Sequence, residues 1–260
     1  MRKFLLFLVL GLWVASCKDD DIGPTTTVNL NFKATYDGRP LVFTDSVYVY
    51  PDGHLIKFDR LNFFISDIAL LEAQGSGEAG LIDIGFLNFS DNSTLPEAET
   101  PLVVSNNKVP VGQYKAIRIG IGVPASLNRS SSTTLPTGNP LRDNAGEFWS
   151  DWDSYIFLKS EGKFDADGSG QFGDGPKEGF GHHPGTDEVY RSITFTHPIV
   201  LEEGKPFDLN FVLDILKLYV KDGVALDLTK PENLDTQSPS DLELAKFLMN
   251  NLLQALALEK

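Results

Sequence analysis

Val28-Asn29-Leu30-Asn31-Phe32-Lys33-Ala34-Thr35-Tyr36 is the stretch of this sequence that decides the fold class. Apolar and polar residues alternate strictly in it, and a period of two is typical of a β-strand with one face in the core and the other in solvent. The pair Asp37-Gly38, which favours a tight hairpin turn, ends the stretch. The segment therefore predicts a half-buried strand and a turn.

Further segments along the chain have the same β character. The expected strands cover residues 41–50, 58–71 with a bend near Ser66-Asp67, 81–89, 109–123, 155–164, 190–196 and 207–214. Two polar stretches, residues 90–108 and 124–148, are expected to be loops, the second a long surface excursion. We therefore expect a mostly β domain, an antiparallel sandwich-like fold.

The C-terminal end follows a helical period. Ser240-Asp241-Leu242-Glu243 has the pattern of a helix-capping box. The apolar residues that recur at helical spacing are Leu242, Ala245, Leu248, Met249, Leu252, Leu253 and Leu256. They predict one amphipathic helix over residues 241–257, whose apolar stripe covers an open part of the sheet or, alternatively, contacts a membrane or partner. Residues 28–260 are expected to form a single domain, because no linker divides them.

The N-terminus has the layout of an export signal. Two basic residues precede an apolar run over residues 4–15 that is short for a membrane span. Val14-Ala15-Ser16-Cys17 resembles the lipobox of bacterial lipoproteins. We therefore expect residues 1–16 to be a signal peptide and Cys17 to become the acylated first residue; a plain signal peptide with an incidental cysteine is the alternative. Cys17 is the only cysteine, so no disulfide can form within the chain.

Residues 17–27 are acidic and then rich in threonine, which is typical of a solvated tether. Lys18-Asp19-Asp20-Asp21 also resembles the signal that sends lipoproteins of Bacteroidetes-type bacteria to the outer face of the outer membrane. We therefore expect a lipid-anchored outer-membrane protein on the periplasmic or the cell-surface side. An ordinary acidic linker is the alternative interpretation.

The chain is strongly acidic. It has 22 Lys and Arg against 36 Asp and Glu, a formal net charge of −14, which becomes −16 when Arg2 and Lys3 leave with the signal peptide. Such a charge repels nucleic acid and anionic head groups and attracts cations. No nucleic-acid partner is therefore expected.

Motifs of common enzymes are missing from the sequence. It has no Gly-x-Ser-x-Gly elbow, no phosphate-binding loop, no His-Glu-x-x-His and no cysteine nucleophile. Pairs of carboxylates for acid–base chemistry cannot be recognised from sequence, because their pairing depends on the fold. We expect a binding protein rather than an enzyme, and a hydrolase of extracellular polymers is the least favoured alternative.

One region combines the side chains best suited to a functional site. Both tryptophans of the mature chain, Trp149 and Trp152, lie within residues 147–162, and His182 and His183 follow in a glycine-rich turn. The alternative is that the tryptophans are core anchors and the histidines belong to a solvated turn.

The order of these segments resembles the MbnP-like family, named for a periplasmic copper-binding protein associated with methanobactin. The motifs that carry the resemblance are Phe63-Phe64-Ile65-Ser66-Asp67-Ile68, Val111-Gly112-Gln113-Tyr114 running to Ile119-Gly120-Ile121-Gly122-Val123, the tryptophan segment, the His182-His183 turn and Asp214-Ile215-Leu216-Lys217-Leu218-Tyr219. The resemblance covers about residues 28–220. The sequence departs from the family pattern in its Trp-x-x-Trp spacing, in Ser154 and Asp67, and in Pro184 after His183.

The resemblance implies a copper site. Copper-binding members use histidine nitrogens together with a tryptophan that a dihaem partner enzyme oxidises to kynurenine, because indole offers no lone pair to a metal whereas kynurenine has an aniline nitrogen. Carried over, the expected copper-binding residues are His183, His182 and Trp149. A dihaem peroxidase-like protein or a TonB-type receptor is the implied partner. A metal-free accessory lipoprotein that docks an outer-membrane transporter or a glycan is the competing hypothesis.

Asp165-Ala166-Asp167-Gly168-Ser169-Gly170 begins like a calcium-binding loop. Asp165, Asp167 and Ser169 stand at the first, third and fifth positions, and glycine stands at the sixth. The twelfth position is Pro176 instead of Glu, which excludes a complete EF-hand. A looser calcium site and a polar hairpin loop both remain open.

Overall fold

The alternating stretch forms β1 (Thr25–Tyr36), in which every second residue is buried. The structure, a computed structural model, describes residues 23–43, 46–129, 132–173 and 179–259. β1 is the centre of a first sheet, between antiparallel β6 (Leu102–Pro110) and parallel β13 (Phe207–Asp214). β17 (Leu256–Leu258) pairs with β13, and β2 (Arg39–Pro40) pairs with the end of β1. The first sheet is therefore mixed, because one of its central pairs runs parallel.

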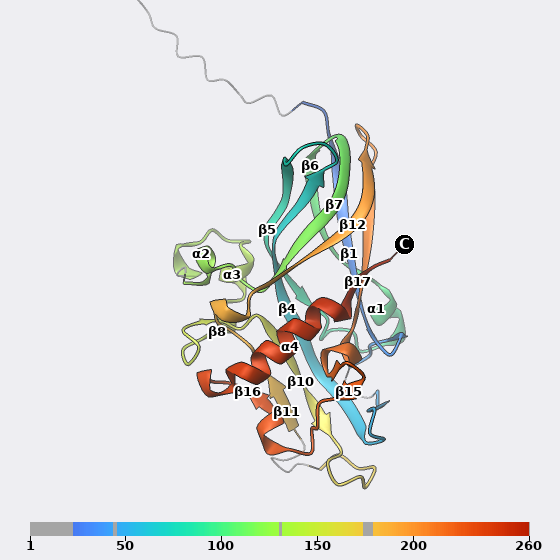
Figure 1. Cartoon of the computed structure of the whole chain (residues 1–260), viewed down its shortest axis with the longest axis vertical. Coiled ribbons are helices and arrows are strands. Elements are labelled where there is room, and N and C mark those ends of the chain that lie inside the picture. Colours follow the sequence, from blue (N-terminus) through green and yellow to red (C-terminus); the bar gives the residue numbers. More distant parts are fainter. Residues whose placement is uncertain (1–22, 44–45, 130–131, 174–178, 260) are drawn as a thin grey trace, which may run out of the picture.

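The second sheet is organised by one long strand, β4 (Leu55–Glu72). On one edge, β7 (Gly112–Ile121) pairs with its second half and β10 (Leu158–Phe164) with its first half, whereas β5 (Glu78–Asn88) occupies the other edge. The remaining strands are β12 (Arg191–Leu201) beyond β7, β11 (Gly179–His182) and β16 (Asp235–Thr236) beyond β10, and β3 (Tyr48–Val49) at the start of β4. We call the end with β5, β6, β7 and β12 the upper part, and the end with β10, β11 and β16 the lower part (Figure 1).

The expected bend in β4 is present at Ser66-Asp67. Asp67 has a positive φ of 46°, and the pairing of β4 with β7 shifts register beside it. Ser66 Oγ donates to the carbonyl of Gly122 (2.9 Å), and the Tyr190 hydroxyl donates to Asp67 Oδ2 (2.8 Å). A Cβ on Gly120 would lie 2.1 Å from that hydroxyl, so this position requires glycine. These contacts explain why a Ser-Asp step and a Gly-x-Gly strand end occur together.

The core lies between the two sheets and beneath α4 (Leu242–Ala255). Phe211 stacks on Phe32 within the first sheet (5.0 Å between ring centroids) and meets Phe195 of the second sheet (5.5 Å). α4 crosses the front of the molecule (Figure 1) and contacts the 3-10 turn η4 (Ile215–Leu218) and β12. Its buried apolar residues are Ala245, Leu248, Met249, Leu252 and Ala255. The expected mostly β fold with one C-terminal amphipathic helix is thus confirmed.

The predicted helix over residues 241–257 was too long. α4 begins at Leu242 after a 3-10 turn, η6 (Pro239–Asp241), whose capping box uses Ser238 and Asp241 instead of Ser240 and Glu243. It ends at Ala255 because the next three residues pair with β13 as β17. Hydrogen bonding to a sheet edge therefore overrides the apolar helical period at this end.

The predicted loop over residues 90–108 was wrong, because it contains α1 (Leu95–Glu99) and most of β6. Apart from Val103, the exposed residues of β6 are polar, and Ser105 Oγ donates to Asn29 Oδ1 of β1 (2.8 Å), so the apolar signal of a strand is weak there. The strand predicted over residues 41–50 is reduced to β3. The strand predicted over residues 155–164 is interrupted after β9 (Ser154–Tyr155) and resumes as β10.

The predicted surface excursion over residues 124–148 is present as short helical turns. These are α2 (Ala125–Asn128), η1 (Ser132–Thr134), α3 (Pro140–Asp143) and η2 (Ala145–Glu147), followed by β8 (Phe148–Trp149). The other short elements are η3 (Asp187–Val189), β14 (Val220–Lys221), β15 (Val224–Ala225) and η5 (Pro231–Asn233).

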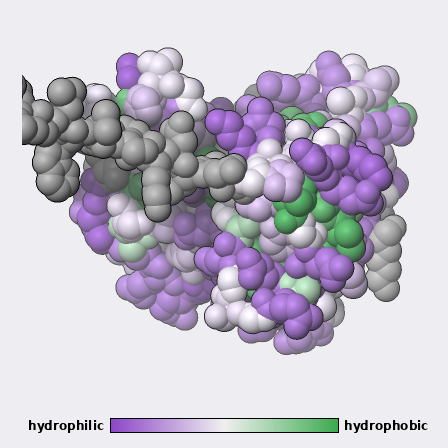
Figure 2. Space-filling model, turned by 90° about the horizontal axis from the view of Figure 1, so that it is seen from above, coloured by the Kyte–Doolittle hydropathy of each residue, from purple (hydrophilic) through white to green (hydrophobic). Residues whose placement is uncertain are grey.

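The described chain begins at the upper end. The amides of Val111 and Gly204, both in upper turns, donate to the carbonyls of Pro24 and Thr25. From that end the surface is mainly hydrophilic, with small hydrophobic patches (Figure 2). The expected signal peptide and Cys17 lie outside the described residues. No helix in the described ranges has the length and apolar character needed to cross a membrane.

Candidate functional site

Trp149 and His183 lie together where the small β8–β9 sheet meets the lower part of the second sheet. Trp149 lies on β8, which pairs with β9 through Trp149 and Ser154, and His183 directly follows β11. The centroids of the two rings are 6.1 Å apart, with an angle of 54° between their planes. The expected convergence of the tryptophan segment and the histidine turn is therefore found for these two side chains.

The structure does not place His182 with this pair. Neighbouring residues of an extended strand point to opposite faces, and His182 points into the core, where it is fully buried. Its Nε2 lies 2.9 Å from the carbonyl of Asn233 and its Nδ1 lies 3.3 Å from the Tyr219 hydroxyl. Burial lowers the pKa of His182 to about 4, so this imidazole is neutral at physiological pH. Both of its nitrogens have polar neighbours within the protein.

Glu161 of β10 orients the His183 ring. His183 Nε2 lies 2.7 Å from Glu161 Oε1, and Arg60 Nε lies 3.4 Å from Glu161 Oε2. The hydrogen bond with His183 is the main reason that the pKa of Glu161 lies below its ordinary value, so the carboxylate is ionised at neutral pH. An ionised carboxylate accepts hydrogen bonds only, and the hydrogen is therefore on His183 Nε2. In the neutral imidazole this leaves the lone pair on Nδ1.

Two buried nitrogens at this site have no hydrogen-bond partner in the part of the chain that the structure describes. They are Nδ1 of His183 and Nε1 of Trp149. Most buried polar atoms in proteins are hydrogen-bonded, and exceptions call for an explanation. A bound cation would account for His183 Nδ1, which carries a lone pair, but not for Trp149 Nε1, because an indole N–H is only a donor. A carboxylate-backed imidazole with an unpartnered second nitrogen is also the arrangement in which histidines bind metals.

A buried ion pair lies next to the site. Lys159 Nζ is 2.6 Å from Glu147 Oε2, and the two side chains are only 10% and 13% exposed. Glu147 stands two residues before Trp149, and Lys159 stands two residues before Glu161 on β10. Sequence analysis missed Glu147, Lys159 and Glu161. The signal that could have found Lys159 and Glu161 is the alternation of charged residues along a strand whose other face is buried; no such signal exists for Glu147, which lies in η2.

An acidic pocket of about 560 Å³ opens beside His183. Its lining includes the carboxylates of Asp59, Glu161 and Asp235 and the backbone of Gly181. Among the residues that the structure describes, no lysine or arginine lines it. The local charge therefore favours the approach of cations.

Trp152 has a different role from Trp149. It is 6% exposed and belongs to the hydrophobic core. A Cβ on Gly185 would lie 3.2 Å from its indole ring, so the glycine of the histidine turn allows close packing. For Trp152 the interpretation as a core anchor is therefore correct, although its Nε1 also lacks a partner among the described residues.

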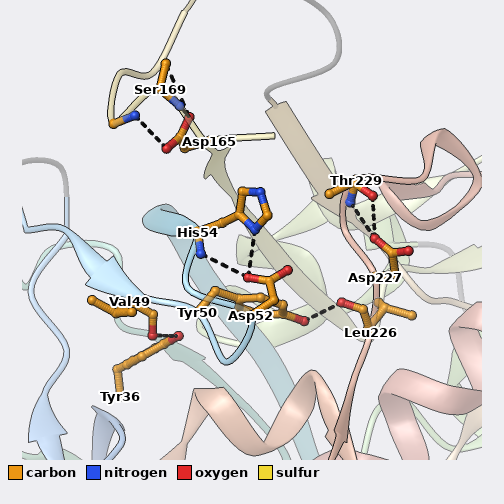
Figure 3. Close-up of polar contacts among 11 residues, drawn as sticks. Tyr36, Val49, Tyr50, Asp52, His54, Asp165, Ser169, Leu226, Asp227 and Thr229 are labelled. Carbon is orange, nitrogen blue, oxygen red and sulfur yellow. Dashed lines mark hydrogen bonds and ion pairs between the residues drawn. The ribbon is translucent and has the colours of Figure 1, made fainter. Parts of the chain in front are cut away.

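The expected calcium loop brings Asp165 and Ser169 together (Figure 3). Asp167 also lies beside Ser169. Asp165 is buried, and its two oxygens accept hydrogen bonds from the amides of Ser169 (3.0 Å) and Gly170 (2.8 Å). Asp167 Oδ1 accepts from the Ser169 amide as well (2.9 Å). The loop is thus held by its own carboxylates, which is the bonding of a polar Asx-type turn. Calcium binding here stays a prediction.

In the described ranges, no group of three or more His, Cys, Asp or Glu side chains is placed to hold a metal ion. Of the two neighbouring histidines, only His183 lines the pocket, because His182 points into the core.

The comparison with protein families agrees with the motifs. The protein-family model described as MbnP matches residues 25–238 of this chain. A solved structure, MbnP from Methylosinus trichosporium, is 16% identical over 78% of this chain and 80% of that chain, with a TM-score of 0.47. No curated protein matches this sequence.

Proposed function

Because the chain belongs to the MbnP family, we propose that it is an extracytoplasmic, lipid-anchored binding protein that holds copper at His183 and Trp149. The observation that carries this proposal is the unpartnered Nδ1 of His183, which has a lone pair to give and belongs to a ring whose centroid lies 6.1 Å from that of Trp149. The role is binding and not catalysis. The protein would supply the bound copper, a redox-active metal, to a partner outside the cytoplasm.

The His183 ring is prepared for metal binding by its surroundings. Glu161 accepts the Nε2 hydrogen at 2.7 Å and so fixes both the tautomer and the orientation of the ring. The acidic pocket beside the ring raises the local concentration of cations. Both features support His183 Nδ1 as the first nitrogen donor.

The second donor is proposed to form from Trp149. Indole nitrogen has no lone pair to give, whereas the aniline nitrogen of kynurenine does. Conversion requires an oxidant, for which we propose hydrogen peroxide used by a dihaem peroxidase-like partner enzyme. Two equivalents of peroxide would deliver two oxygen atoms across the C2–C3 bond of the indole, which breaks, and would leave as water. Hydrolysis of the resulting formamide would then release formate, so that the side chain gains one oxygen and loses one carbon in all. The unmodified protein is then expected to bind copper weakly.

Two measurements on the natively expressed protein test this function. Mass spectrometry of the Trp149 peptide should show the gain of oxygen and loss of carbon. Chelator competition with copper should give tight binding that falls by about tenfold or more in His183→Ala and is unchanged in His197→Ala, a matched histidine control on β12. Protein that carries the oxidised Trp149 and still binds no copper above background would contradict the proposal.

The proposed lipid anchor and the proposed copper site lie toward opposite ends of the molecule. The described chain begins at the upper end, whereas β8, which carries Trp149, and β11, which His183 follows, lie toward the other end (Figure 1). An anchor at Cys17 would therefore leave the site directed away from the membrane and open to a partner. Detergent partition of the wild type, lost in Cys17→Ala, tests the anchor, and protease treatment of intact cells distinguishes the cell surface from the periplasm.

A further inference from the structure

The buried ion pair between Lys159 and Glu147 connects the segment that carries Trp149 to the strand that orients His183. We propose that Lys159 is a positioning residue, and that its ion pair with Glu147 holds the Trp149 ring against the His183 ring. That the two rings are held together to bind copper rests on the proposed function, but the distance between the rings can be measured in metal-free protein.

Trp149 is attached to the rest of the fold close to Glu147. The Ile156 amide donates to the carbonyl of Glu147 (2.7 Å), and the Glu147 side chain reaches Lys159 Nζ (2.6 Å). Trp149 follows two residues later, at the end of the surface excursion. The carboxylate of Glu147 therefore fixes the point from which the indole extends.

The burial of this pair makes it sensitive to substitution. Its side chains are 10% and 13% exposed, whereas those of the Arg118–Glu78 pair in the upper part are 33% and 49% exposed. A charge left alone in a buried site is costly, so the segment that bears it moves toward water when its partner is removed. Loss of Lys159 should therefore draw Glu147 outward, and Trp149 with it.

Both halves of the site depend on one face of β10. Lys159 and Glu161 are two residues apart on this strand and so point to the same side. Glu161 holds His183, and the pairing of Ser160 with His182 places His183 on the strand next to Lys159. The spacing of Lys159 and Glu161 thus sets how far apart the tryptophan and histidine rings lie.

The test measures the position of Trp149 in copper-free mature protein. The two indole N–H signals are assigned with Trp149→Phe, and the nuclear Overhauser effect between the Trp149 and His183 ring protons is recorded in each variant. We expect it in the wild type and in Lys159→Arg, which keeps the charge, and expect its loss in Lys159→Met. Acrylamide quenching of Trp149 fluorescence should rise by about twofold or more in Lys159→Met. Arg118→Met, which breaks the exposed pair, is the control and should change neither readout.

If Lys159→Met keeps the ring contact and the quenching of the wild type while only its urea midpoint falls, Lys159 is a structural residue and the proposal is wrong. If Lys159→Met does not fold, Glu147→Gln, which keeps the shape of the side chain, gives the same test with the same two outcomes. A wild type that shows the ring contact but binds no copper would contradict the proposed function and leave the positioning role intact.

Discussion

Replacing Gly162 by alanine should break the contact between β10 and β4 that directs Glu161 toward His183. Gly162 lies at a bulge, where the register passes from Glu161 opposite Arg60 to Gly162 opposite Phe58. A Cβ at Gly162 would lie 2.0 Å from the carbonyl oxygen of Lys57 and 2.7 Å from the Phe180 ring. The first obstacle is backbone, so the strands must separate to admit the methyl group.

The size of the effect follows from these contacts. Forcing a methyl group into a packed site costs about 1–3 kcal/mol. Each ladder hydrogen bond lost when the strands separate adds about 1 kcal/mol. We expect the free energy of unfolding to fall by about 3–4 kcal/mol in Gly162→Ala, which leaves a domain of ordinary stability folded.

Gly179→Ala is the matched control on the neighbouring strand. Among the described residues, the nearest atom to a Cβ there is the carbonyl oxygen of Gly162 at 4.0 Å, so no described atom obstructs the methyl group. Its free energy of unfolding should stay within about 0.5 kcal/mol of the wild type. Urea unfolding followed by circular dichroism measures both variants. Equal stability of the two variants would refute the argument from close approach. Under the proposed function, copper affinity should also fall by about tenfold or more in Gly162→Ala, because Glu161 no longer meets His183.

Three further predictions concern groups outside the immediate site. From pH 7 to pH 5 the wild type should lose about 2 kcal/mol more stability than His182→Gln. The pKa of His182 is about 4 in the folded protein and has its ordinary value of 6.5 in the unfolded chain. Between these two values only the unfolded chain takes up the proton, so the fall in pH favours unfolding. Urea unfolding at the two pH values measures this difference, and equal slopes would count against it. Asp165→Ala should lower the free energy of unfolding by about 2 kcal/mol, because two loop amides lose their acceptor. Calcium binding would be supported if adding calcium to chelator-treated protein raises the melting temperature of the wild type and not that of the variant. Tyr190→Phe should cost about 1 kcal/mol in a thermal melt, since it removes the hydrogen bond to Asp67, and a larger loss would mean that the bend in β4 needs that bond to form.

The strands with one buried face were predictable from sequence alone. β1 and β13 are buried at every second residue along most of their length, so their burial appears directly as a period of two in the sequence. β6 escaped prediction because its polar residues are satisfied by polar residues of β1, as Ser105 is by Asn29. The end of α4 escaped it because the apolar period of a helix and the pairing of a short edge strand compete for the same residues, and only the position of β13 decides the outcome.

The partners within the site were less predictable. The resemblance to a family indicated Trp149 and His183, but Glu161 comes next to His183 through the antiparallel pairing of β10 with β11. Register between two strands depends on the whole sheet, and one sequence does not reveal it. The ion pair between Glu147 and Lys159 likewise joins a surface excursion to a strand whose partner could not be known in advance.

The separation of His182 from His183, by contrast, follows from a rule that the sequence already offered. Once residues 179–182 form a strand, two successive side chains point to opposite faces and do not share one ligand. Turning His182 toward His183 would break its contacts with Tyr219 and Asn233, and each polar group left buried without a partner costs about 1–3 kcal/mol. The site therefore has a single imidazole, and under the proposed function its second donor has to come from Trp149. Copper binding of equal strength before and after oxidation of Trp149 would contradict this reasoning, because strand geometry leaves the unmodified site with too few donors.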